Sequence, residues 1–246
     1  YLILGKASGW SMDSDLSAAD ASFIGEDTYD SSGYTVSGAG DVNGDGYDDF
    51  IIGAYENDDG GSNAGQTYLI LGKASGWSMD TALSDSDASF IGENSDDESG
   101  YALSGAGDVD NDGYDDFIIG AYRNGDDEYR AGQTYLILGK ASGWSMDTDL
   151  SDADASFIGE DFYDMSGCAV SGAGDVNGDD YDDFLIGAYY DEDGGEGAGQ
   201  TYLILGKASG WSMDTDLSDA DASFIGESNY DYSGYAVSGV GDVNGD

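Results

Sequence analysis

The sequence predicts an all-β protein, a β-propeller built from four-stranded antiparallel blades on a 67-residue repeat. Three observations lead to this fold. The segment YLILGKASGW begins at Tyr1, Tyr68, Tyr135 and Tyr202. Each full repeat contains four short segments with the composition of β-strands. The chain also contains 41 glycines, which suits short strands joined by tight turns.

The four strand segments follow one another within each repeat. In the first repeat, residues 32–40 alternate larger side chains with small ones, and residues 49–55 form a short apolar run typical of a buried strand. Residues 65–73 are rich in β-forming side chains, and residues 88–93 complete the set. The stretch 76–87 is long enough for a helical turn but too short and polar for a core helix.

Four strands per unit favour a propeller because stacking buries the apolar faces that a single unit leaves exposed. A β-solenoid is the alternative, but its coils usually need only about 20–30 residues. A sandwich would not produce near-identical units. We therefore expect one repeat array over residues 1–246, cut from a longer array at both ends. It divides into a partial blade 1–31, the blades 32–98, 99–165 and 166–232, and a partial blade 233–246.

The composition excludes several classes of function. The formal net charge is −46 with only six basic residues, which excludes nucleic acid as a partner because that binding needs clustered Lys and Arg. No apolar run approaches the ~18 residues of a transmembrane helix, so we expect no membrane insertion in this segment. Histidine is absent, as are the G-x-S-x-G and H-E-x-x-H motifs, and we expect no enzymatic activity. Fifty-two carboxylates suit metal binding or a surface adapted to salt.

An acidic loop joins the first two strands of each repeat. It reads DVNGDGYDD at 41–49, DVDNDGYDD at 108–116 and DVNGDDYDD at 175–183, and a fourth copy ends after DVNGD at 242–246. Side-chain oxygens at positions 1, 3, 5 and 9, with a backbone carbonyl at position 7, form a donor set that Ca²⁺ prefers. The expected ligands are Asp41, Asn43, Asp45, Tyr47, Asp49, Asp108, Asp110, Asp112, Tyr114, Asp116, Asp175, Asn177, Asp179, Tyr181, Asp183, Asp242, Asn244 and Asp246.

The backbone of this loop must curl tightly for alternate residues to point inward. Gly44 and Gly46 permit the positive φ that the curl requires, and Asp180, which replaces the second glycine in the third loop, tolerates the left-handed region. An EF-hand loop needs Glu at its position 12. Counted from the first aspartate of each complete acidic loop, position 12 is an isoleucine in all three repeats. A plain β-turn is the remaining alternative, but a hairpin does not need converging acids in every repeat.

The order strand, D-x-[ND]-x-D-G-x-x-D loop, strand and Gly-Ala resembles the FG-GAP repeat of the integrin α-subunit propeller and its tandem bacterial and archaeal versions. The resemblance covers the whole chain. It implies a seven-bladed propeller, calcium in the loop between a blade's first two strands, and a non-enzymatic role in adhesion and ligand binding. The chain departs from the family with Ser-Gly-Tyr at 32–34 in place of Phe-Gly, and with Gly-Ala-Tyr at 53–55 in place of Gly-Ala-Pro.

Differences between the repeats concentrate in two loops that an up-and-down blade places on one face, here named the variable-loop face. These loops are 26–32, 93–99, 160–166 and 227–233 before the first strand, and 56–63, 123–130 and 190–197 between the second and third strands. The acidic loops and the constant KASGWSMD segment are expected on the opposite face. Changes within 56–63 should therefore affect binding alone, whereas Asp45→Ala should affect folding.

The variable-loop face is expected to bind a protein or glycan ligand or to mediate self-association, because loops on a rigid scaffold commonly carry recognition. Simple drift of exposed loops is the alternative. Aromatic residues in these loops favour binding. They are Tyr29, Tyr129, Phe162, Tyr163, Tyr190, Tyr230 and Tyr232.

The sequence thus predicts a non-enzymatic, calcium-binding propeller that mediates adhesion or protein and glycan interaction, located extracellularly or at the cell surface. Extracellular calcium modules often have a Kd of about 10⁻⁴–10⁻³ M, which restricts them to calcium-rich surroundings. The alternative is a structural repeat unit of an extracellular array, sheath or fibre with calcium as a stabiliser. The near-identity of the repeats favours that alternative.

Overall fold

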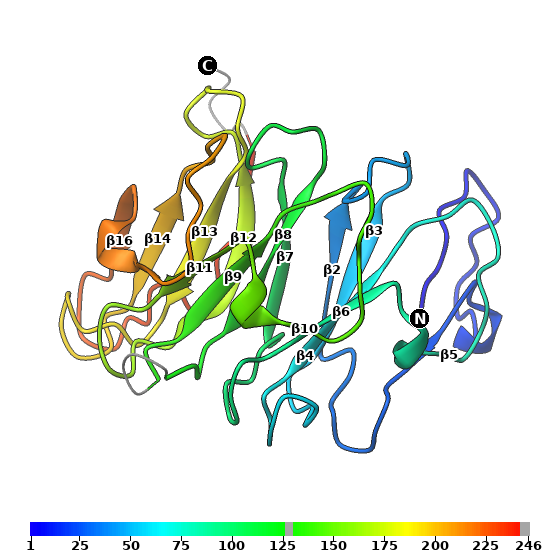
Figure 1. Ribbon diagram of the computed structural model, residues 1–246, viewed down its shortest axis with the longest axis horizontal. Helices are drawn as coiled ribbons and strands as arrows, with labels where there is room; N and C mark the ends of the chain where they lie inside the picture. The colour runs from blue at the N-terminus through cyan, green and yellow to red at the C-terminus, as the bar shows by residue number, and fades with distance from the viewer. Residues whose placement is uncertain (126–129, 242–246) are drawn as a thin grey trace.

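The protein is described by a computed structural model over residues 1–125 and 130–241. Three β-sheets of four or five strands follow one another in chain order from the right to the left of Figure 1, and β1 and β5 form a separate two-stranded sheet. The helical segments among the described residues are 3₁₀ turns of three residues each. None of them is long or apolar enough to cross a membrane. The prediction of an all-β chain with antiparallel sheets is confirmed.

Each of the three larger sheets contains the four strand segments predicted for one repeat. The first sheet is formed by β2 (Thr35–Gly40), β3 (Asp49–Ala54), β4 (Gln66–Ile70) and β6 (Ala88–Ile91). The second is formed by β7 (Ala102–Gly107), β8 (Asp116–Ala121), β9 (Gln133–Ile137) and β11 (Ala155–Ile158). The third is formed by β12 (Ser166–Gly174), β13 (Asp183–Ala188), β14 (Gln200–Ile204) and β16 (Ala222–Ile225). Strands that follow one another in these lists pair antiparallel.

Short parallel strand pairs join consecutive repeats. β10 (Thr148–Asp149) pairs with β6, β15 (Thr215–Asp216) pairs with β11, and β5 (Thr81–Ala82) pairs with β1 (Phe23–Ile24). A 3₁₀ turn follows each added strand directly, and this turn is the helical segment predicted within 76–87. These turns are η2 (Leu83–Asp85), η3 (Leu150–Asp152) and η4 (Leu217–Asp219). A further 3₁₀ turn, η1 (Leu16–Ala18), precedes β1 in the N-terminal segment.

The hydrophobic core lies between consecutive sheets. Neighbouring residues of one strand point to opposite faces of a sheet, so Ile119 packs toward the first sheet and Ile118 toward the third. Both side chains are fully buried. The continuous apolar run of the second strand is therefore explained by burial on both of its faces, as for a strand in the interior of a stacked structure.

The first strands of the three sheets, β2, β7 and β12, lie next to one another. A Cβ placed on Gly105 would lie 2.8 Å from the carbonyl oxygen of Gly38, and one on Gly172 would lie 2.7 Å from that of Gly105. A side chain at these positions would push adjacent sheets apart. Glycine is therefore required where the first strands approach most closely.

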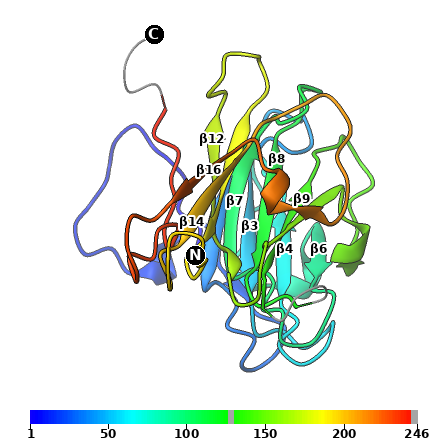
Figure 2. The same cartoon turned by 90° about the vertical axis from the view of Figure 1, so that its left-hand side faces the viewer.

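The connections emerge at two ends of the sheets, as expected from the antiparallel strand order. At one end Lys140 N donates to Val42 O at 2.9 Å, which joins an acidic loop to the segment after a third strand. At the other end Glu98 N donates to Asn63 O at 3.0 Å, which joins two variable loops. Figure 2 views the molecule from the side of the third sheet, where β16 forms the outer edge. Within the described ranges, no strand pairing joins this sheet to the N-terminal segment.

Candidate metal centre in the acidic loops

The acidic loops connect β2 to β3, β7 to β8 and β12 to β13, and each curls through residues with positive φ. In the first loop, Gly44 and Gly46 have φ of 72° and 88°. Asp180 has φ of 71°, so the left-handed conformation predicted for the third loop is confirmed. Asn111 takes the place of the first glycine in the second loop, with φ of 57°, a region that Asn visits more readily than most residues.

The first aspartate of each loop is held by the backbone of its own turn. In the second loop, Asp108 Oδ1 accepts from Asp112 N at 3.0 Å and Asp108 Oδ2 accepts from Gly113 N at 2.9 Å. Asp41 and Asp175 accept the equivalent pairs of bonds in the other two loops. These backbone N–H donors of the loop itself orient the first carboxylate.

The ninth aspartate is the buried anchor of each loop. Asp116 is fully buried, and its carboxylate accepts from Val109 N at 2.8 Å and from Gly139 N at 2.7 Å. It therefore ties the start of the loop to the segment after β9. The pKa of Asp116 is raised to about 8, chiefly by burial and also by the carboxylates of Asp110 and Asp108, although these two hydrogen bonds act in the opposite direction.

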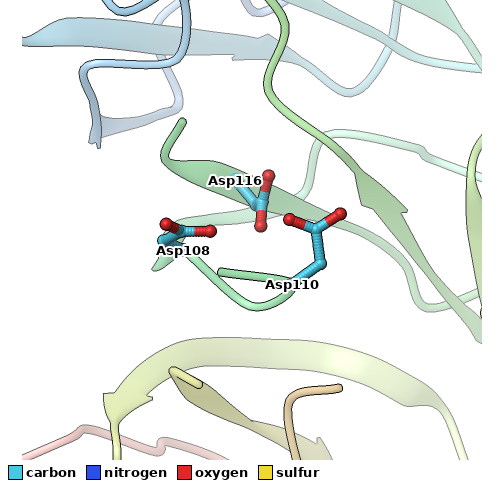
Figure 3. A group of neighbouring side chains, drawn as sticks. All are labelled: Asp108, Asp110 and Asp116. Atoms are coloured by element: carbon cyan, nitrogen blue, oxygen red, sulfur yellow. The ribbon is translucent and has the colours of Figure 1, made fainter. Parts of the chain in front are cut away.

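Three carboxylates converge in the second loop (Figure 3). One oxygen each from Asp108, Asp110 and Asp116 lies within 4.8 Å of the other two. A Ca²⁺ ion binds its oxygens at about 2.3–2.6 Å, so two ligands of one ion can be separated by up to about 5 Å. The spacing and the all-oxygen donor set therefore fit this ion. The side chain of Asp112, expected as a ligand, is not part of this cluster, and its Oδ1 accepts from Tyr114 N at 3.0 Å.

The first and third loops have an amide at the third position, Asn43 and Asn177, where the second loop has Asp110. Burial raises the pKa of Asp49 to about 6 and also raises the pKa of Asp183. As in the second loop, each ninth carboxylate accepts two backbone hydrogen bonds, of 2.6–3.0 Å. The fourth set of expected ligands lies outside the described residues. These are Asp242, Asn244 and Asp246.

The segments that contain the first two acidic loops match a known repeat family. Residues 32–70 and 99–137, which span β2 to β4 and β7 to β9, each match the FG-GAP repeat. The chain contains FG-GAP repeats. The first three strands of these two sheets, together with their acidic loops, are therefore the part of the chain that matches this repeat, and the resemblance stated from the sequence is confirmed.

Proteins similar to this chain include integrin α-subunits. Integrin alpha-8 of Gallus gallus is 30% identical over 173 residues, 68% of this chain and 16% of that protein. Integrin alpha-PS2 of Drosophila melanogaster is 31% identical over 163 residues, 64% of this chain and 11% of that protein. Phosphatidylinositol-glycan-specific phospholipase D of Dictyostelium discoideum is 31% identical over 221 residues, 82% of this chain and 23% of that protein. The FG-GAP chain thus spans less than a quarter of the length of each of these relatives.

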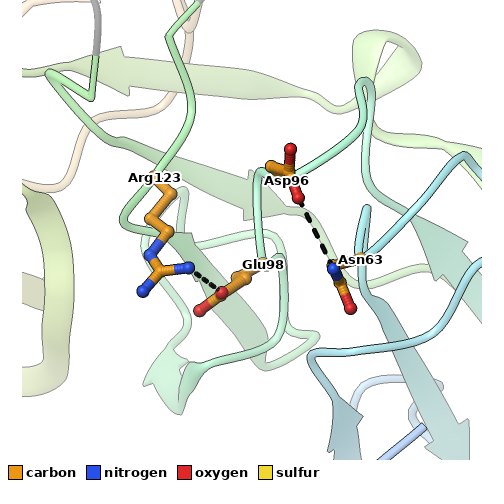
Figure 4. Close-up of polar contacts among 4 residues, drawn as sticks. All are labelled: Asn63, Asp96, Glu98 and Arg123. Atoms are coloured by element: carbon orange, nitrogen blue, oxygen red, sulfur yellow. Dashed lines mark hydrogen bonds and ion pairs between the residues drawn. The ribbon is translucent and has the colours of Figure 1, made fainter.

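The opposite end of the FG-GAP sheets carries the variable-loop face (Figure 4). Asn63 Nδ2 donates to Asp96 Oδ1 at 3.4 Å, and the guanidinium of Arg123 forms an ion pair with Glu98. Each contact joins a loop between second and third strands to a loop before a first strand. Several aromatic residues expected on this face are exposed, and Tyr190 is half-buried, whereas Tyr129 lies outside the described residues. The exposed ones are Tyr29, Phe162, Tyr163, Tyr230 and Tyr232.

The expectation that 56–63 bears only on binding is wrong at Asn57. This side chain is 3% exposed, and its Nδ2 donates to Tyr68 Oη and Asp30 Oδ2, both at 3.4 Å. Asn57 therefore fixes the loop to a core tyrosine. The third repeat has the buried Asp191 at this position, which accepts from Tyr202 Oη at 3.1 Å.

The sequence reasoning also missed a role for the eighth aspartate of the second and third loops. Asp115 and Asp182 make hydrogen bonds to the preceding acidic loop rather than contributing to the carboxylate cluster. The signal was present as an Asp-Asp pair at positions 8 and 9 of every complete loop. A single repeat cannot reveal this role because the partner lies 74 positions earlier in the chain.

Proposed function

We propose that this chain is a non-enzymatic, calcium-binding part of an extracellular or cell-surface β-propeller that mediates adhesion. The convergence of Asp108, Asp110 and Asp116 within an FG-GAP repeat carries the proposal. Carboxylate oxygens held on a curled loop are suited to a hard divalent cation. Each ion would link the first two strands of its blade and stiffen that face of the sheet stack.

The blades of the proposed propeller are 32–98, 99–165 and 166–232, with partial blades 1–31 and 233–246. The burial of apolar residues between consecutive sheets supports this division, as does the close approach of their first strands. The parallel pairs β6–β10 and β11–β15 supply a further link between neighbouring blades. A propeller of this family would continue the same stacking with further repeats until a ring closes.

The ligand of the proposed adhesion surface is a protein or a glycan bound at the variable-loop face. Exposed tyrosines and phenylalanine there offer rigid contact area at a low entropic cost. The similarity to integrin α-subunits supports a role in adhesion. The sequence contains no histidine to act as a general base, which supports a non-enzymatic role. One relative bears the name of a phospholipase, but this chain matches only 23% of it.

A second candidate function is that of a structural repeat unit in an extracellular array, sheath or fibre, with calcium as a stabiliser and self-association as the mode of assembly. The identical segment KASGWSMD in all four copies favours it, because a ligand-binding propeller has less need for such uniformity. Electron microscopy of the native assembly separates the two functions. Closed discs support adhesion by a propeller, and a continuous polymer supports the structural unit.

The calcium proposal is tested by calorimetric titration of the full chain. We expect about three sites, and the substitution Asp110→Ala should remove one of them. A matched control is Asp85→Ala, which removes one exposed carboxylate outside the acidic loops and should leave the number of sites unchanged. Absence of calcium binding by the unsubstituted chain would contradict the proposal.

A further inference from the structure

Neighbouring acidic loops are joined by a reciprocal pair of hydrogen bonds. Asp41 N donates to Asp115 Oδ2 at 2.7 Å, and Asp115 N donates to Asp41 O at 3.3 Å. The next pair of loops repeats this arrangement between Asp108 and Asp182, at 3.0 and 3.2 Å. The eighth residue of one loop therefore holds the first residue of the preceding loop, which is the first expected metal ligand there.

The residue before each held aspartate is a glycine that leaves room for this contact. A Cβ on Gly40 would lie 2.1 Å from Asp115 Oδ2, and one on Gly107 would lie 2.0 Å from Asp182 Oδ2. The two glycines have φ of 77° and 78°, where a side chain is disfavoured. Any other residue at these positions would displace the aspartate from the loop it holds.

A second connection runs from the buried anchor of one loop to the preceding loop. Asp116 Oδ1 accepts from Gly139 N at 2.7 Å, and the next residue, Lys140, donates its N–H to Val42 O at 2.9 Å. The same connection links the third loop to the second, where Lys207 N donates to Val109 O at 2.8 Å. The anchor of each later loop thus positions a backbone donor for the earlier one.

The environment of the eighth aspartate differs between loops in a way that supplies a control. Asp115 and Asp182 are half-buried against the preceding loop, whereas Asp48, at the same position of the first loop, is exposed. All three directly precede the buried ninth aspartate. A substitution at Asp48 therefore removes the same charge from the same loop position without breaking the described contact to another loop.

We infer that Asp115 and Asp182 are positioning residues that couple neighbouring sites for a divalent cation, so that occupancy of one loop raises the affinity of the preceding loop. The inference rests on the proposed function. Ordering of the second loop fixes Asp115 and the Gly139–Lys140 segment, and these two elements hold Asp41 and Val42 in the first loop. Because binding linkage is reciprocal, occupancy of the first loop also raises the affinity of the second.

Calcium titration of the full chain by calorimetry tests the positioning role. In a background with Asp110→Ala and Asn177→Ala, the sites of the second and third loops lose a ligand and the first loop remains. Adding Asp115→Ala should weaken the remaining site about tenfold, the loss expected for one hydrogen bond to a charged group. Asp115→Asn keeps an acceptor oxygen and should retain most of the affinity. The matched control Asp48→Ala should change the affinity by less than about twofold.

The coupling itself is tested without any substitution of Asp115. Restoring Asp110, so that the second loop regains its ligand, should tighten the first site about fivefold or more. No change of the first site on this restoration would overturn the inference while calcium binding stands, as would equal losses from Asp115→Ala and Asp48→Ala. If the unsubstituted chain binds no calcium, the proposed function itself fails. Far-UV circular dichroism checks that each variant is folded.

Discussion

The carboxylate of Asp49 accepts a hydrogen bond from the backbone N–H of Gly72 at 2.6 Å, and so fastens the first acidic loop to the chain that follows the third strand. Its other oxygen accepts from Val42 N at 3.0 Å. Asp49 is 2% exposed, whereas Asp45 is exposed and its Oδ1 accepts a bond from Tyr47 N within the loop. The scaffold role expected for Asp45 therefore falls to Asp49 when no metal is bound.

Asp49→Ala should destabilise the metal-free protein by about 2–4 kcal/mol, because it leaves two buried backbone donors without a partner. Asp45→Ala should cost less than about 1 kcal/mol under the same conditions, since its partner lies in an exposed turn. Urea denaturation in chelator measures both values. Equal losses would show that the buried hydrogen bonds of Asp49 do not stabilise the fold.

Removal of calcium should lower the melting temperature by about 10 °C or more. An ion at one hundred times its Kd stabilises by about 2.7 kcal/mol per site, and each kcal/mol shifts a chain of this size by about 2–4 °C. Without the ion, the carboxylates of each loop also repel one another, and added salt should recover part of the loss by screening. Differential scanning calorimetry with and without chelator gives the answer, and superimposable melting curves would contradict calcium stabilisation.

Asp191→Asn should stabilise the protein more at pH 8 than at pH 4. Burial, with added repulsion from Asp191 and Glu160, raises the pKa of Asp164 to about 7. A carboxyl with a raised folded pKa stays protonated more readily in the folded state, so its ionisation destabilises the fold as the pH rises from about 4 to about 7. Asparagine at position 191 would remove the negative charge that faces Asp164. Its amide could donate to Asp164 as Asn57 donates to Asp30 in the first repeat.

The expected gain from Asp191→Asn is about 1–3 kcal/mol at pH 8 and close to zero at pH 4. Urea denaturation at the two pH values measures the difference. The control is Asp193→Asn, which removes a charge of the same loop whose carboxyl is more exposed than that of Asp191. A gain of equal size at both pH values would mean that the ionisation of Asp164 is not responsible.

The melting temperature should rise with potassium chloride even when calcium is saturating. Three calcium ions would offset only a small part of the formal charge of −46, so most carboxylates remain unpaired by metal. Their repulsion extends over about 30 Å at 0.01 M ionic strength but only about 3 Å at 1 M. Thermal melts across this range measure the effect, and a melting temperature that does not respond to salt would require another role for the acidity.

Much of the repeat could be read from its sequence because the relevant signals are local. The apolar run of β3 and β8, the β-forming residues of β4 and β9, and the glycine-rich curl of the loops each depend on neighbours in the chain. The position of Asp180 in the left-handed region followed from its own conformational preference.

The features that the sequence did not reveal depend on contacts between repeats. The two-residue strands β10 and β15 have no hydrophobic pattern of their own and form only against the outer strand of the preceding sheet. The burial of Asn57 depends on Tyr68, and the contact of Asp115 depends on Gly40 at the end of β2 in the preceding repeat. A polar residue in a loop looks the same in sequence whether its neighbour is solvent or another repeat.

The most direct test of the central claim is a crystal structure grown in calcium, with diffraction data that record the anomalous signal of the ion. We predict a peak between Asp108, Asp110 and Asp116, at about 2.3–2.6 Å from one oxygen of each, and equivalent peaks in the first and third loops. Acidic loops that contain only water while the protein is folded in millimolar calcium would contradict the claim.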